Sequence, residues 1–140
     1  MKQSVTLTIT SLLSILLLTF HMAGDILFGM ASPRFANLIA VLVFVIWLYG
    51  TLVLAERRAG YIIILFGSLL GLVVLLVHMK GANGLLGGAI GKSAQALFFV
   101  WTLLALGVTA TFSVILSVHA LWKLPWRRQQ RTAAGKTFEG

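Results

Sequence analysis

The chain has 140 residues and a formal net charge of +8; 59% of its residues are hydrophobic and only 10% are charged. Soluble domains carry about 25% charged residues, and a chain this short has too little interior to bury so much apolar surface. A water-soluble globular protein is therefore excluded, and we expect one transmembrane domain over residues 1–140. The absence of cysteine also excludes disulfides, thiolate catalysis and cysteine-ligated metal sites.

Four apolar stretches follow one another along the chain, at about 5–28, 37–55, 61–79 and 95–122. A transmembrane helix needs roughly 20 predominantly apolar residues, which each stretch approaches or exceeds. The stretches predict an all-α fold, an integral membrane four-helix bundle. A basic segment, 123–140, follows the last of them.

The first apolar stretch also resembles a signal peptide, because Lys2 precedes it. Cleavage after Ala23 needs a small residue two positions earlier, where His21 stands. We therefore expect this stretch to remain as the first transmembrane helix.

Glycine and proline predict the boundaries and contacts of the later helices. Residues 56–60 (Glu-Arg-Arg-Ala-Gly) predict a tight turn between an antiparallel pair, with Gly60 in the left-handed conformation that ends the second helix. In the third helix, Gly67 and Gly71 form a small-xxx-small pattern that lets helix backbones approach closely in lipid. Pro125 predicts the end of the fourth helix.

The basic residues predict the orientation in the membrane. With four crossings, eight of the eleven Lys and Arg residues fall on the side of the two termini and three on the other side. The positive-inside rule then places both termini in the cytoplasm, in the inner (plasma) membrane. We expect the basic segment to contact anionic lipid headgroups. We do not expect nucleic-acid binding, because that segment has no fold to fill a groove.

A small polar cluster is expected at the outer end of the bundle. His21 and His78 lie 16 and 17 residues into the first and third stretches, so both imidazoles are roughly 25 Å from the cytoplasmic ends. Asp25 follows His21 by four residues and shares its helix face. Ionisable groups inside a membrane mark functional sites by default.

Three interpretations of this cluster remain open. The groups hydrogen-bond one another or water in a structural role, or they form a site for a proton or small solute. Alternatively they bind a cofactor: His21 and His78 as axial ligands of a haem, or the same histidines with Met22 and Met79 as ligands of copper. Asp25 supplies a third ligand in a metal site.

At the inner end, Glu56, Arg57 and His119 are candidates for an ion pair or a proton relay. The simpler interpretation is a solvated ion pair at the headgroups. His-Met pairs ending the first and third stretches also hint at a duplicated two-helix unit, although chance similarity explains them as well.

The function that we expect first is non-enzymatic: a compact accessory protein that packs with itself or with a larger membrane complex. The alternatives are a transporter of a small solute, ion or proton that uses the His/Asp cluster, and a haem- or copper-binding subunit. An enzyme is the least supported, because the chain has only three acidic residues and one of them, Glu139, lies in the basic segment.

Overall fold

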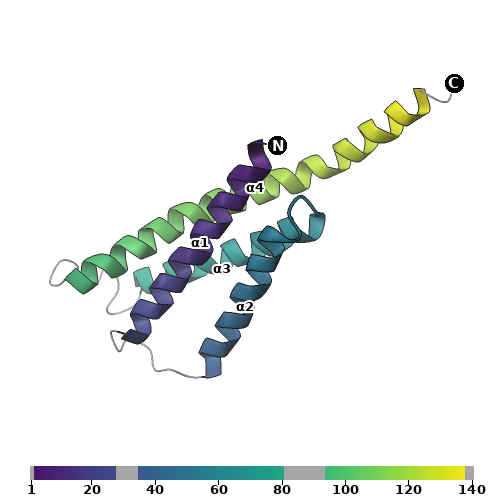
Figure 1. Cartoon of the computed structure of the whole chain (residues 1–140). Coiled ribbons are helices and arrows are strands. Elements are labelled where there is room, and N and C mark those ends of the chain that lie inside the picture. The colour runs from purple at the N-terminus through teal and green to yellow at the C-terminus, as the bar shows by residue number, and fades with distance from the viewer. Residues whose placement is uncertain (1, 28–34, 81–93, 138–140) are drawn as a thin grey trace.

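The computed structural model describes residues 2–27, 35–80 and 94–137, and these form four helices without a strand (Figure 1). The helices are α1 (Lys2–Leu27), α2 (Phe35–Leu52), α3 (Arg58–Lys80) and α4 (Ala94–Thr137). The predicted all-α fold is confirmed. Three of the helices contain segments long and apolar enough to cross a membrane: Ser4–Leu27, Arg58–Met79 and Leu97–Lys123.

The helix α2 is shorter than the sequence predicts. Its described apolar part, Leu38–Leu52, is about 22 Å long against a hydrocarbon core of about 30 Å. The chain leaves the helix at Val53, so the predicted range of 37–55 is too long at its C-terminal end. The first half of α2 packs little, whereas Trp47, Gly50 and Thr51 in the second half are buried.

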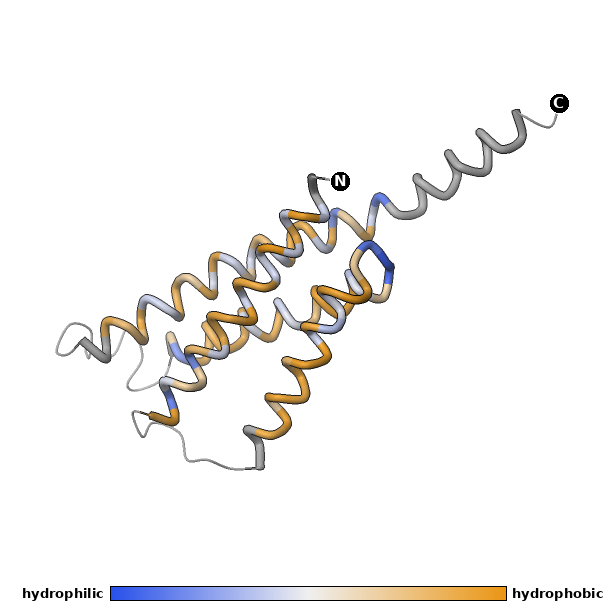
Figure 2. Tube along the Cα trace, viewed as in Figure 1, coloured by the Kyte–Doolittle hydropathy of each residue, from blue (hydrophilic) through white to orange (hydrophobic). Residues whose placement is uncertain are grey.

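The helix α4 lies against α1 and α3, and α2 lies against α3 and α1 (Figure 1). Among the described residues no Cα atom of α2 lies within 8 Å of one in α4, so these two helices are separated by α1 and α3. The helices α1 and α3 run in the same direction, which brings their C-terminal ends to the same end of the molecule. Hydrophobic residues make up most of the described length of the helices, and the most hydrophilic residues lie near the ends of the bundle (Figure 2).

The turn between α2 and α3 differs from the prediction. Glu56, not Gly60, has the positive φ, at 66°. Gly60 lies inside α3 and is buried, and a Cβ atom there would collide with the carbonyl oxygen of Leu54. Glycine is therefore needed at position 60 because two backbone segments approach closely there. The left-handed conformation is adopted instead by the exposed Glu56.

The prediction that Pro125 ends the fourth helix is wrong. The helix α4 has 44 residues and continues to Thr137, so its last part extends beyond the other three helices (Figure 1). Proline lacks the N–H that would bond to the carbonyl four residues earlier, and inside a helix it costs about 3 kcal/mol; α4 nevertheless continues past Pro125. The basic segment therefore begins as a helical continuation of the last apolar stretch.

Leucine, isoleucine and tryptophan side chains from all four helices form the core of the bundle, with Leu7, Leu18, Trp47, Ile64 and Leu106 at its centre. Glycines make room for the larger of these groups. A Cβ at Gly67 would collide with the indole of Trp47, and one at Gly107 would come within 2.6 Å of the Leu75 side chain. Pairing a glycine with a large side chain on the facing helix fixes the register of each contact.

Candidate metal centre

The helices α1 and α3 bring His21, Asp25 and His78 together near their C-terminal ends. The Oδ2 atom of Asp25 lies 3.8 Å from Nε2 of His21 and 3.7 Å from Nε2 of His78. The two imidazole rings are nearly perpendicular, at 86°, with centroids 4.7 Å apart. The spacing of four residues puts His21 and Asp25 on one face of α1, and the equal depth of the histidines in two parallel helices brings His78 to the same level.

Several polar atoms of this cluster have no hydrogen-bond partner. His21 is 1% exposed, and neither of its ring nitrogens is hydrogen-bonded; Oδ1 of Asp25 also lacks a partner. Separations of 3.7 and 3.8 Å are too long for hydrogen bonds between the three side chains. Because buried polar groups are nearly always satisfied, the unpaired atoms of His21 and Asp25, with Nε2 of His78 facing them, indicate a site for a bound species.

The hydrogen bond of His78 determines which of its nitrogens is available. Nδ1 of His78 lies 2.8 Å from the carbonyl oxygen of Val74, one turn earlier in α3. A carbonyl oxygen only accepts, so Nδ1 carries the proton and donates it to Val74. In the neutral ring Nε2 then presents a lone pair toward Asp25, and two acceptors face each other unless a cation or a proton lies between them. Histidines that bind metals through one nitrogen usually donate the other N–H in this way.

The spacing of the donor atoms suits a small metal ion. One ligand atom from each of His21, Asp25 and His78 lies within 4.8 Å of the other two. In a tetrahedral zinc site, bonds of about 2.0–2.1 Å place the ligands about 3.4 Å apart. Side-chain movements of a few tenths of an ångström to about 1 Å would close the triangle around such an ion. Three protein ligands leave a fourth position open to water or another small ligand.

A haem does not fit between these histidines. Axial ligation places the two imidazoles on opposite faces of the porphyrin, with their ring centroids about 6 Å apart. Here the centroids are 4.7 Å apart, the rings are perpendicular, and the carboxylate of Asp25 lies close to both. The geometry favours a single ion.

The methionines next to the histidines are poorly placed to join the site. Met22 and Met79 each follow a histidine directly, so they are turned by about 100° around the helix axis from the face that carries it. Asp25, four residues after His21, is the residue that shares the face. Two imidazoles and a carboxylate suit Zn²⁺ and other borderline divalent ions better than the soft ion Cu(I).

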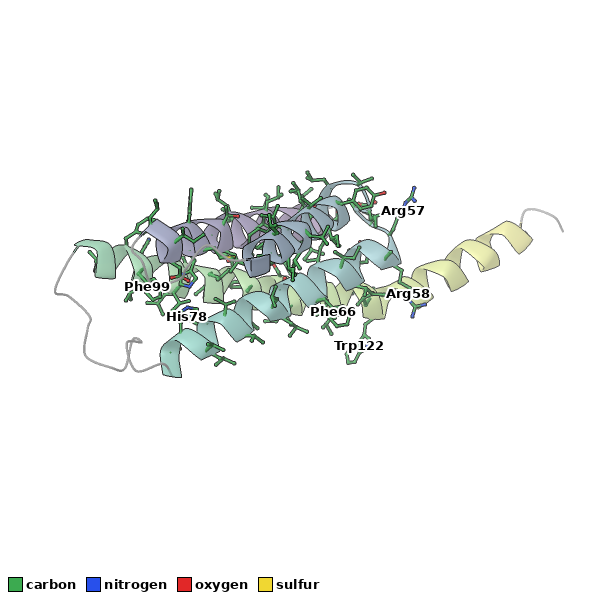
Figure 3. The ribbon with its side chains drawn as sticks, turned by 90° about the horizontal axis from the view of Figure 1, so that it is seen from below. Arg57, Arg58, Phe66, His78, Phe99 and Trp122 are labelled. Atoms are coloured by element: carbon green, nitrogen blue, oxygen red, sulfur yellow. The ribbon has the colours of Figure 1, made fainter. Side chains whose placement is uncertain are left out.

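Phe99 of α4 covers the cluster and is the contact that the sequence did not reveal (Figure 3). Its ring centroid lies 4.6 Å from that of His21, at 42°, and 5.7 Å from that of His78, at 59°. The aromatic run of residues 98–101 was visible in the sequence, but only as a feature of the possible duplication. The packing of α4 against α1 and α3 determines which ring of this run faces the histidines. Sequence periodicity alone does not predict that packing.

The structure does not bring the other candidate residues into one site. Glu56, Arg57 and His119 are exposed, and within the described residues no ion pair joins Glu56 to either of the other two. Arg57 lies at the far end of the bundle from His78 (Figure 3). Gly67 and Gly71 are buried, but against different helices: Gly67 against Trp47 of α2, and Gly71 against Leu106 and Ala110 of α4.

No protein-family model, curated protein or solved structure matches the chain.

Proposed function

We propose that the chain is an integral protein of the inner membrane, with four crossings and both termini in the cytoplasm. Three helices of sufficient length and apolar character support the membrane location. Large apolar side chains exposed along all four helices support it too, because a lipid environment would cover them. The exposed Arg57 and Arg58, which follow α2, fall on the side with more basic residues.

The parallel course of α1 and α3 supports α2 as the remaining crossing. If α1 and α3 both cross from the cytoplasm outward, the chain has to return between them, and α2 is the helix that connects these levels. A helix shorter than the hydrocarbon core is accommodated by local thinning of the bilayer. The helical continuation of α4 then lies on the cytoplasmic side, and from the sequence we expect the basic segment to contact anionic headgroups.

Within this membrane protein, the proposed activity is the binding of one divalent transition-metal ion, of the Zn²⁺ type, near the outer surface. The observation that carries this proposal is the convergence of His21, Asp25 and His78, in which both ring nitrogens of His21 and Oδ1 of Asp25 have no hydrogen-bond partner. The proposal adds a defined ion to the membrane protein that the sequence predicts. Its ligands come from two helices, so binding also joins α1 to α3.

The test is metal binding by the purified protein, stripped of metal with a chelator and then titrated with Zn²⁺ by calorimetry. We expect one ion per chain, and a loss of affinity of at least 100-fold when His21→Ala or His78→Ala removes one of three ligands. Asp25→Asn, which keeps the shape of the side chain, is expected to weaken binding by 10- to 100-fold.

The chain offers matched controls for each type of change. His119→Ala removes an exposed histidine of α4, and Glu56→Gln neutralises an exposed acid in the turn after α2. Both variants should bind Zn²⁺ like the unmodified protein. Zinc binding that persists in His21→Ala and His78→Ala at the original affinity would contradict the proposal, and so would the absence of binding in the unmodified protein.

A further inference from the structure

We infer that the site of His21, Asp25 and His78 is open only toward the outer side of the membrane, so that the protein holds its ion and does not conduct it. This inference rests on the proposed function and adds the direction of access. It also decides between a binding protein and the transporter that the sequence left as an alternative.

Exposure within the cluster increases toward the helix ends. The side chain of His21 is 1% exposed, that of Asp25 is 16% exposed and that of His78 is 31% exposed. Asp25 and His78 each lie two residues before the last residue of their helix. His21 is therefore the most enclosed of the three side chains, and the two more exposed ones lie nearest the ends of α1 and α3.

A layer of leucines closes the inner side of the site. Leu18, three residues before His21, is 2% exposed, and Leu103 and Leu106, the next inward-facing leucines of α4 after Phe99, are completely buried. Leu18 and Leu106 belong to one packed cluster, to which α3 contributes Val74. Side chains from three helices thus meet directly beneath the imidazoles.

The hydroxyl groups deeper in the bundle do not bridge this layer. Ser14 lies seven residues before His21, about 10 Å along α1. Its hydroxyl donates to the carbonyl of Thr10 or to Thr109. Thr102 is buried at the level of the leucines, but its hydroxyl donates to the carbonyl of Phe99. A divalent cation would have to lose its ligands to pass these leucines, and a charge without ligands is strongly disfavoured in an apolar layer.

The first experiment uses the fact that the chain has no cysteine, so a single introduced cysteine reports on one position. Asp25→Cys, Ser14→Cys and Glu56→Cys are each exposed to a membrane-impermeant thiol reagent, in right-side-out and in inside-out vesicles. We expect Cys at position 25 to react in one vesicle orientation only. Cys at position 56, in the exposed turn after α2, is the control for the opposite side and should react only in the other orientation. Cys at position 14, beneath the leucines, should react in neither.

Reaction of position 25 in both orientations, or of position 14 in either one, would overturn the inference. The labelling does not depend on zinc. One-sided labelling in a protein that binds no zinc would therefore refute the proposed function and leave the one-sided opening in place.

The second experiment measures flux. Unmodified protein is reconstituted into vesicles that contain a fluorescent zinc indicator, and Zn²⁺ is added outside. We expect the signal to match that of protein-free vesicles even at zinc concentrations that saturate binding. Influx at several times the rate of the protein-free vesicles would show that ions pass the leucine layer and would overturn the inference.

Discussion

The indole Nε1 of Trp47 lies 2.9 Å from Oγ of Ser11, and this hydrogen bond ties α2 to α1. Oγ of Ser11 also lies 2.8 Å from Oγ1 of Thr51, whose hydroxyl donates to the carbonyl of Trp47. The same indole packs on Gly67 of α3. One buried tryptophan therefore holds three helices together, in the half of α2 that is packed into the bundle.

Gly67→Ala should destabilise the protein, because the added Cβ collides with the indole of Trp47. Overpacking of this kind costs about 1–3 kcal/mol. Gly71→Ala is the matched control, since its Cβ would meet Ala110 and Leu106 at 3.4 Å, an ordinary contact. Thermal unfolding in detergent should show a lower Tm for the first variant and an unchanged one for the second. Equal Tm values would mean that Trp47 does not pack on Gly67.

Ser11→Ala should leave the buried indole N–H of Trp47 without an acceptor. Leaving a buried donor unpaired costs about 1–3 kcal/mol, although hydrogen bonds between membrane helices average about 0.6 kcal/mol. We therefore expect a loss of about 1 kcal/mol in the free energy of unfolding. Thr19→Ala removes an exposed hydroxyl bonded to its own helix and serves as the control. The indole resonance of Trp47 in an NMR spectrum should shift in the first variant only.

Some of these relationships follow from the sequence and others do not. Helix periodicity is local, so the spacing of His21 and Asp25 is enough to predict that they share one face of the first helix. The positions of His21 and His78 along their helices likewise predict that the two imidazoles lie at the same depth. The same periodicity predicts that Gly67 is a packing residue but not that its partner is Trp47. That choice depends on the register between helices, which large side chains such as Trp47 and Leu75 set by fitting against glycines.

The turn after α2 shows a second limit of the sequence. Gly60 is the obvious residue for a left-handed position, because glycine adopts it without strain. A stronger requirement at the same residue, close approach to Leu54 and Gly50, places it inside α3 instead. Glu56 then adopts the conformation that glycine would have favoured. Local rules predict that this segment is a turn, but they do not predict which of its residues adopts the left-handed conformation.

Glu56→Gly should therefore leave the fold intact and stabilise it slightly. The left-handed conformation at φ 66° costs a residue with a side chain roughly 1 kcal/mol relative to glycine. Part of that gain is lost because glycine makes the unfolded chain more flexible. Ala55→Gly, at the adjacent exposed residue, relieves no left-handed strain and should therefore be neutral or destabilising. A lower Tm for Glu56→Gly than for Ala55→Gly would contradict the assignment of the strained residue.

Zinc should stabilise the folded protein against heat, because the ligands converge only when α1 and α3 are packed together. A free ligand concentration of 100 times the Kd adds about 2.7 kcal/mol to the free energy of unfolding. The Tm should rise with zinc in the unmodified protein and in His119→Ala, and a chelator should reverse the rise. His78→Ala should show no rise, and an equal rise in this variant would place the ion elsewhere.

Phe99→Leu should weaken zinc binding although phenylalanine donates no ligand. Its ring lies against both imidazoles, so it acts as a positioning residue for His21 and His78. Changes to groups that orient metal ligands typically cost 10- to 100-fold in affinity, and we expect the lower end because leucine still fills part of the space. Phe98→Leu, at the adjacent residue with 47% exposure, is the matched control and should leave the Kd unchanged. If both variants keep the original Kd while Phe99→Leu lowers the Tm, Phe99 serves only the packing of α4.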